Sequence, residues 1–176
     1  GLNSWASVCA TPERFLFRVN TGVRINFDDV HAAARFTALK LQEQWSDRPL
    51  YLAFSGGSDS EFVANALTQA QVPFTPLLLQ IKGINDLEYW YADYWCQQHK
   101  VEPVILQAEP WDFEKLMPEF ARTVKNTNQI VAIVNFYINK KVVELDGYCV
   151  YGTGDINFDS DGSITFGNLQ GSGSII

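Results

Sequence analysis

The sequence predicts an α/β protein built on a parallel β-sheet with helices on both faces. From residue 50 onward, short apolar runs alternate with longer segments whose apolar residues have helical spacing. The run from Pro76 to Lys82 is almost continuously apolar, as expected for a strand covered on both faces. Alternation of this kind favours parallel strands, because each helix carries the chain back to the start of the next strand.

The predicted elements follow in a regular order. Four strands are expected, over Leu50–Phe54, Pro76–Lys82, Glu102–Gln107 and Tyr148–Gly152. Five helices are expected, over Asp28–Trp45 (capped by Asp28 or Asn26), Ser60–Ala70, Asn85–Gln98, Trp111–Lys125 and Asn128–Leu145. We therefore expect one domain over residues 28–158, an extended or hairpin segment over residues 1–27, and a C-terminal tail over residues 159–176.

The two flanking segments have weaker patterns. Around the turn Asn20-Thr21-Gly22, the runs Glu13–Val19 and Val23–Ile25 are typical of a hairpin. In the tail, Ile164–Phe166 is long enough for a short strand, and the Gly/Ser-rich end has no pattern of regular structure.

Composition bounds the class of protein. The chain has 176 residues, of which 47% are hydrophobic, enough to build a core. Its 13 basic and 20 acidic side chains give a net charge of −7, which disfavours a general nucleic-acid surface, with a tRNA substrate left open. No apolar stretch approaches the ~20 residues of a membrane helix, so no membrane partner is expected. The three cysteines have no disulfide or metal-ligand spacing, which predicts a reducing, cytoplasmic compartment.

The turn after the first predicted strand carries the strongest chemical signal. It has the sequence Ser55-Gly56-Gly57-Ser58-Asp59-Ser60 and leads directly into a helix. Backbone N–H groups at a helix N-terminus bind anions, and glycines permit positive φ and close approach of a phosphate. The three serines add hydroxyl donors. Asp59 is a hard carboxylate of the kind that holds Mg²⁺ beside a phosphate.

This six-residue string resembles the Ser-Gly-Gly-x-Asp-Ser signature of the PP-loop ATP pyrophosphatases, the adenine nucleotide α-hydrolase-like superfamily. Asparagine, GMP and NAD synthetases belong to it, as do several tRNA-modifying enzymes and the phosphoadenylylsulfate reductases. The resemblance covers about residues 48–158 and implies a doubly wound, Rossmann-like sheet of the HUP type. It also implies Mg²⁺-dependent binding of ATP and its cleavage to AMP and pyrophosphate, with adenylation of an acceptor for amide or thio transfer.

The resemblance also assigns roles to individual residues. Asp59 is the expected metal ligand, and the cradle for the phosphates consists of Ser55, Gly56, Gly57, Ser58 and Ser60. After the fourth strand, Tyr151-Gly152-Thr153-Gly154-Asp155 is similar to the second nucleotide-side turn of the superfamily. There Gly152 and Gly154 are expected near the nucleotide, and Asp155 binds Mg²⁺ or orients substrate; the alternative is that Asp155 only caps a turn.

The segment after the second strand is nearest in pattern to the reductase branch. Lys82-Gly83-Ile84-Asn85-Asp86-Leu87-Glu88 leads from the strand end to an acidic residue in the next helix. In the superfamily the backbone at this strand end, here Gln80–Lys82, holds adenine, and Lys82 is a candidate phosphate contact. The same residues also fit an ordinary helix cap from Asn85 to Glu88, which the sequence favours slightly.

Several features of known members are missing. The chain has no cysteine pair of the tRNA-thiolating kind, no C-terminal cysteine motif of the sulfate-reducing kind and no glutaminase domain. Two alternatives therefore stay open: a catalytically silent nucleotide-binding or structural subunit, and a protein that handles adenylylsulfate. The acceptor substrate, a homo-oligomeric state and a partner subunit are also left open.

Overall fold

The computed structural model describes residues 28–123 and 131–152 with their side chains, and the backbone of four further strands at 7–11, 14–18, 155–158 and 164–167. The chain divides into two compact units, Gly1–Ala33 and Ala34–Ile176. None of the helices in the described part of the chain is long and apolar enough to cross a membrane.

The first unit contains an antiparallel hairpin. Strand β1 (Ser7–Thr11) pairs with β2 (Arg14–Arg18), with Thr11 opposite Arg14 and Ser7 opposite Arg18. The strand predicted over Glu13–Val19 corresponds to β2, but its predicted partner, Val23–Ile25, is wrong, because the strand that pairs with β2 precedes it in the chain. The predicted turn at residues 20–22 and the run that follows lie outside the described residues.

Helix α1 (Val30–Gln44) begins one residue after its cap. The carboxylate of Asp29 accepts a hydrogen bond from the Ala32 N–H at 2.8 Å, which is the usual position for an N-cap bond. The expected cap at Asp28 is therefore wrong by one residue, and Asn26 lies outside the described residues.

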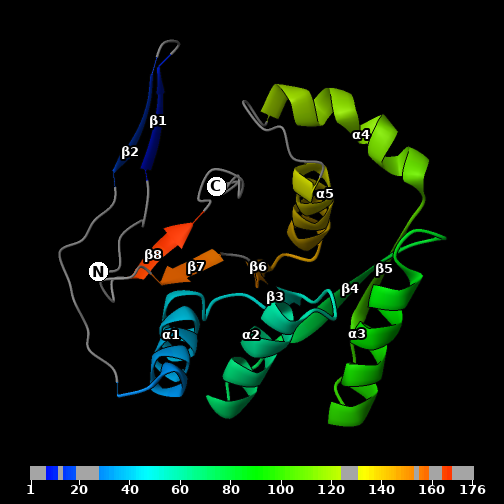
Figure 1. Cartoon of the computed structure of the whole chain (residues 1–176). Helices are drawn as coiled ribbons and strands as arrows, with labels where there is room; N and C mark the ends of the chain where they lie inside the picture. The colour runs from blue at the N-terminus through cyan, green and yellow to red at the C-terminus, as the bar shows by residue number, and fades with distance from the viewer. Residues whose placement is uncertain are drawn as a thin grey trace. The chain divides into compact units, whose positions relative to one another are not determined.

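The second unit is organised around a four-stranded parallel sheet (Figure 1). Its strands are β3 (Leu50–Ala53), β4 (Thr75–Ile81), β5 (Val104–Ala108) and β6 (Tyr148–Tyr151), in the order β5-β4-β3-β6. The connecting helices are α2 (Ser58–Gln69), α3 (Asp86–His99), α4 (Pro110–Thr123) and α5 (Val131–Glu144). The predicted fold class is confirmed, and the predicted elements agree with the observed ones to within a few residues.

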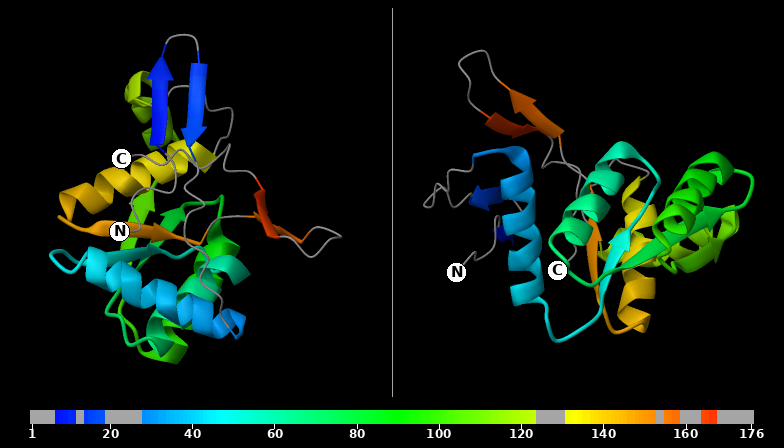
Figure 2. Two further views of the ribbon diagram at one scale, coloured as in Figure 1. Left: turned by 90° about the vertical axis from the view of Figure 1, so that its left-hand side faces the viewer. Right: turned by 90° about the horizontal axis from the view of Figure 1, so that it is seen from below.

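The helix layers on both faces of the sheet explain why the strand sequences are mostly apolar. Leu52 and Leu78 point to the side covered by α1, α2 and α3, whereas Tyr51 and Leu77 pack on the other side against α5. Both sets are buried, because alternate residues of each strand face opposite layers. Figure 2 shows α2 and α5 on opposite sides of the sheet in both views.

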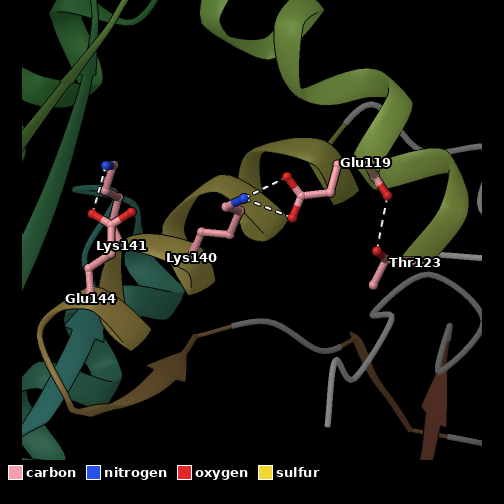
Figure 3. A network of polar contacts seen from close by, with 5 residues as sticks. All are labelled: Glu119, Thr123, Lys140, Lys141 and Glu144. Atoms are coloured by element: carbon pink, nitrogen blue, oxygen red, sulfur yellow. Dashed lines mark hydrogen bonds and ion pairs between the residues drawn. The ribbon is translucent and has the colours of Figure 1, made fainter.

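Helices α4 and α5 pack against each other and extend the second layer. Phe120 and Phe136 meet edge to face with ring centroids 5.6 Å apart, and both are buried. Beside them Lys140 donates to both carboxylate oxygens of Glu119, at 2.8 and 2.6 Å (Figure 3). Residues 124–130, between the two helices, lie outside the described residues.

A second antiparallel pair follows the sheet. Strand β7 (Asp155–Phe158) pairs with β8 (Ile164–Gly167), with Asp155 opposite Gly167. The short strand predicted in the tail is confirmed. Asp155, which the sequence placed in a turn after the fourth strand, instead begins a strand with a partner of its own.

Candidate functional site

The sheet has one point at which the direction of strand order reverses. The chain proceeds outward from β3 to β4 and β5, then crosses back to place β6 on the other side of β3. In open α/β sheets, ligands bind outside the carboxyl ends of the strands at this switch point. Here the two strands end next to the Ser55–Ser60 turn and next to Gly152.

Gly152 shows how closely these two strand ends approach. A Cβ atom at this position would lie 2.7 Å from the carbonyl oxygen of Asp59 and 2.8 Å from Cα of Ser60. Only a glycine lets the end of β6 lie this close to the first turn of α2. The end of β6 and the Ser55–Ser60 turn therefore meet at one edge of the sheet.

The two glycines of the turn have different geometries. Gly56 has a φ of +80°, and a Cβ on it would lie 2.7 Å from the Glu88 carbonyl oxygen and 2.8 Å from the Ala92 nitrogen. Gly57 has a φ of −83°, and a Cβ there would meet only the Ser55 hydroxyl at 3.5 Å. The expected positive φ is found at Gly56 but not at Gly57, and the space for a side chain differs: Gly56 is required for packing against α3, whereas Gly57 is open. Their role in phosphate binding stays a prediction.

The serine hydroxyls also divide into two groups. Ser60 is 3% exposed, and its hydroxyl donates to the Gly57 carbonyl at 2.9 Å and lies 3.1 Å from the Ser55 hydroxyl. The Ser55 oxygen in turn accepts from the Gly57 N–H at 3.4 Å. These contacts stabilise the shape of the turn, so the Ser60 hydroxyl is already committed. Ser55 and Ser58 remain exposed.

The start of α2 is suited to an anion. Its cap is Gly57, which makes no side-chain bond to the first-turn N–H groups, and these groups have no partner within the helix. They carry the positive end of the helix dipole, which favours a negatively charged ligand. Asp59 lies exposed in this turn, 3.5 Å from the Ser58 hydroxyl that donates to it.

The donor set also fits magnesium. Mg²⁺ at a phosphate site commonly takes one or two protein carboxylates, and the remaining ligands are phosphate oxygens and water. Within the described residues, no group of three Cys, His, Asp or Glu side chains gathers into a metal site of its own. Asp59 therefore fits as a protein ligand of a metal ion that is shared with a bound phosphate.

A cavity of about 340 Å³ opens beside the turn. Ser55, Ser60 and Gly152 lie on its wall, together with the ends of β3 and β4 and the facing sides of α3 and α5. Most of the lining is apolar; the polar lining residues beyond the two turns are Asn85, Glu88, Tyr89, Asn135 and Tyr151. This volume and this mixture of apolar walls with a few polar groups are typical of small-molecule sites.

Tyr151 forms one wall at the end of β6. Its hydroxyl donates to the Asn139 side-chain oxygen at 2.9 Å and also lies 3.2 Å from the Asn135 carbonyl oxygen. Burial is the main cause that raises the pKa of Tyr151 above its usual value, so the phenol stays protonated. Tyr151 therefore joins β6 to α5 beside the cavity as a neutral donor.

The end of β4 is satisfied from within the chain. Asn85 precedes α3, and its side-chain oxygen accepts from the Ile81 N–H at 2.7 Å while its amide donates to the Leu79 carbonyl at 2.8 Å. Asn85 occupies the N-cap position of α3, as the capping interpretation predicts, but its side chain makes no cap bond to the helix. Instead its carboxamide occupies part of the Gln80–Lys82 backbone that the family resemblance reserves for adenine.

The remaining predicted site residues lie apart from the cavity or beyond what the structure describes. Lys82 is exposed at the end of β4, does not line the cavity, and its N–H donates to the Ala108 carbonyl at 3.4 Å. Gly154 lies outside the described residues, and only the backbone of Asp155 is described. Their expected roles stay predictions.

The aromatic residues of α3 do not all belong to the core. Trp95 is buried against Phe54, but Trp90, Tyr91 and Tyr94 are about half exposed. Trp90 stacks on Tyr94 with ring centroids 5.6 Å apart. Trp95 therefore belongs to the core, whereas Trp90, Tyr91 and Tyr94 pack against one another on the exposed side of α3.

Among the polar side chains on the cavity wall, the sequence singles out Ser55 and Ser60 but assigns no ligand role to Asn85, Glu88, Asn135 or Tyr151. Asn85 and Glu88 belong to the segment interpreted as a strand-end loop or a helix cap, and Asn135 belongs to a helix with no motif. Tyr151 was visible as the neighbour of Gly152 at a strand end, which was the one available signal. Their partners lie in other elements, so spacing along the chain carries no trace of the arrangement.

No family model and no curated protein matches this sequence. Among solved structures, the chain is similar to an NH3-dependent NAD synthetase from Campylobacter jejuni, with 19% identity and a TM-score of 0.46. It is also similar to an NMN synthetase from Francisella tularensis, with 15% identity and a TM-score of 0.49. The two matches each cover 69% of this chain and 51% and 54% of those proteins, so the chain spans about half their length.

Proposed function

We propose that this chain is a Mg²⁺-dependent, ATP-binding PP-loop domain that cleaves ATP between the α- and β-phosphates. The observation that carries the proposal is the Ser55–Ser60 turn. It joins the central strand β3 to a helix N-terminus without a side-chain cap, at the switch point of the sheet, and it borders a cavity of about 340 Å³. Asp59 is exposed in the same turn.

In this proposal the chain acts mainly by electrostatics and position. The first-turn N–H groups of α2 and the open face of Gly57 hold the phosphates, while the apolar cavity holds the nucleoside. An acceptor oxygen attacks the α-phosphorus, the bond to the bridging oxygen breaks, and its electron pair leaves with pyrophosphate. Donors aimed at this developing charge lower the barrier because they are already oriented. The adenylated acceptor is then open to amide or thio transfer.

Bound Mg²⁺ would neutralise charge on the departing phosphates, with Asp59 as its protein ligand. Asp155 is proposed as a second ligand or as a residue that orients the acceptor, and Gly154 as part of the second turn. Lys82 follows the end of β4, and its long side chain is proposed to contact a phosphate.

A calorimetric titration tests the proposal. ATP is titrated into the wild type, Asp59→Asn and Glu61→Gln, with and without Mg²⁺. Glu61 is the matched control, since it is the other acidic residue in the first turn of α2. We expect Mg²⁺ to strengthen ATP binding at least tenfold in the wild type and in Glu61→Gln, and to have little effect in Asp59→Asn, because that variant loses the metal's carboxylate. Equal affinities in all cases would refute the metal-ligand role.

Pyrophosphate release then separates the reaction classes. With a competent acceptor present, the wild type should release pyrophosphate from ATP, and Asp155→Asn should lower the rate more than the affinity. Binding without release would instead identify a silent nucleotide-binding subunit. A clear preference for adenylylsulfate over ATP would favour a nucleotidyl-sulfate protein.

A further inference from the structure

The sheet leaves two backbone groups of β4 without a strand partner beside the cavity. Strand β3 ends at Ala53, and the bond from the Phe54 N–H to the Leu77 carbonyl, 2.9 Å long, follows directly after it. Alternate residues of a strand present their backbone groups to the same neighbour. The groups of Leu79 and Ile81 therefore point to the side where β3 no longer runs.

Asn85 satisfies this pair. Its side-chain oxygen accepts a hydrogen bond from the Ile81 N–H at 2.7 Å, and its amide nitrogen donates one to the Leu79 carbonyl at 2.8 Å. The orientation of the carboxamide follows from chemistry, because an N–H group requires an acceptor and a carbonyl requires a donor. All three residues line the cavity.

We propose that Asn85 is an internal competitor for the nucleotide base. Its carboxamide occupies a donor and an acceptor that an adenine edge would otherwise use, so a base binds at this strand end only when Asn85 leaves. The inference rests on the proposed function and adds to it a residue that sets the affinity and base selectivity of the site.

The chemistry of the two groups supports the competition. Adenine presents an amino donor next to a ring-nitrogen acceptor, and a carboxamide presents the same pair of groups, which is why the two pair with each other in nucleic-acid recognition. Hypoxanthine, held with its sugar in the same place, presents an oxygen and an N–H in the reverse order. It would place donor against donor at Ile81 and acceptor against acceptor at Leu79.

The competition has an energetic consequence. Each hydrogen bond of Asn85 contributes a modest net stabilisation, and a base must replace both. A base binds only to molecules in which the Asn85 carboxamide has left the strand end. The apparent affinity for the base is therefore reduced to the fraction of molecules in that state. Removal of the carboxamide should therefore strengthen binding of ATP, by about tenfold, and leave binding of ITP unchanged.

The test compares Asn85→Ala and Asn85→Ser with the wild type by calorimetry with ATP and ITP, at constant Mg²⁺. Serine is included because it is a good helix cap and preserves the start of α3 if alanine does not. Asp86→Ser is the matched control: Asp86 lies next in the chain and accepts a hydrogen bond from the Gly83 N–H at 3.4 Å, so its loss loosens the same loop without freeing the strand pair. Thermal unfolding of every variant shows whether each is folded.

We expect tighter ATP binding and unchanged ITP binding in both Asn85 variants, and no gain in Asp86→Ser. In the wild type, ATP should also shift the side-chain amide resonance of Asn85 in an ¹⁵N NMR spectrum towards that of a solvent-exposed amide. Weaker or unchanged ATP binding in folded Asn85 variants overturns the inference, as do equal gains for ATP and ITP. Failure of the proposed function has a different signature: neither the wild type nor any variant binds ATP.

Discussion

Two neighbouring glycines, Gly56 and Gly57, illustrate how one short turn serves both the fold and a ligand. The left-handed conformation of Gly56 and its closeness to the backbone of α3 leave no room for a side chain. Gly57 lies in extended conformation with open space beside it. Substitution at the two positions should therefore separate stability from binding.

We predict that Gly56→Ala destabilises the protein by about 2 kcal/mol or more, because it combines a strained φ with overlap against backbone atoms. Gly57→Ala should cost less than about 1 kcal/mol, the usual loss for this change at a helix cap. Urea denaturation of both variants measures the difference. Equal losses would mean that the turn adapts freely at Gly56.

Gly57→Val should keep the fold and lose nucleotide binding. A β-branched side chain is compatible with the extended backbone of this residue, but it covers the N–H groups proposed to hold phosphate. Calorimetric titration with Mg²⁺–ATP provides the measurement, and thermal unfolding provides the control for folding. Normal affinity in this variant would place the phosphates elsewhere.

At the scale of elements, the contact between α4 and α5 combines two interactions of different strength. Phe120 is buried against Phe136, whereas the ion pair of Glu119 with Lys140 is partly exposed. Burial of an aromatic side chain removes a large apolar area from water, but an exposed ion pair gains little because water and salt screen the charges.

We predict that Phe120→Ala lowers the free energy of unfolding by about 3 kcal/mol or more and that Glu119→Gln lowers it by less than about 1 kcal/mol. The midpoints of urea unfolding test both values. Raising the salt concentration should reduce the effect of Glu119→Gln and leave that of Phe120→Ala unchanged. A larger loss for Glu119→Gln would show that the ion pair, and not the aromatic contact, holds α4 in place.

At the scale of the whole molecule, buried thiols link stability to alkaline pH. Burial raises the pKa of Cys96 and of Cys149 from 9.0 to about 11 in each case. Burial also raises the pKa of Tyr89 and Tyr137. The folded protein thus keeps protons that the unfolded chain has already released, and such thiols are poor nucleophiles near neutral pH.

The sign of the effect follows from proton linkage. Above pH 9 the unfolded state binds fewer protons than the folded state, so stability falls as the pH rises from 9 to 11. Each thiol contributes a slope of at most about 1.4 kcal/mol per pH unit. Urea midpoints between pH 8 and 11 should show this decline, and Cys96→Ala should have a shallower one. A pH-independent midpoint across this range would contradict the prediction.

Strand and helix positions in the second unit follow from local sequence. Leu50–Phe54 and Pro76–Lys82 are mostly apolar because both faces of the sheet are covered, and this local pattern was sufficient to predict parallel strands. Local pattern was not sufficient for the first hairpin. Local propensity identified β2 but contained no information about which neighbouring run would pair with it, so the predicted partner was wrong.

By itself, the sequence determined the α/β class, the order of strands and helices, and the Ser55–Ser60 turn with Asp59 at the start of α2. Each of these depends on residues that are adjacent in the chain, so composition and spacing record them. Only the tertiary structure decided that Gly56 and Gly152 are packing residues, that Tyr151 bonds to α5, and that Asn85 occupies the end of β4. These roles depend on which backbone groups the sheet leaves unpaired and which elements approach one another, and that information exists only once the strands are in register.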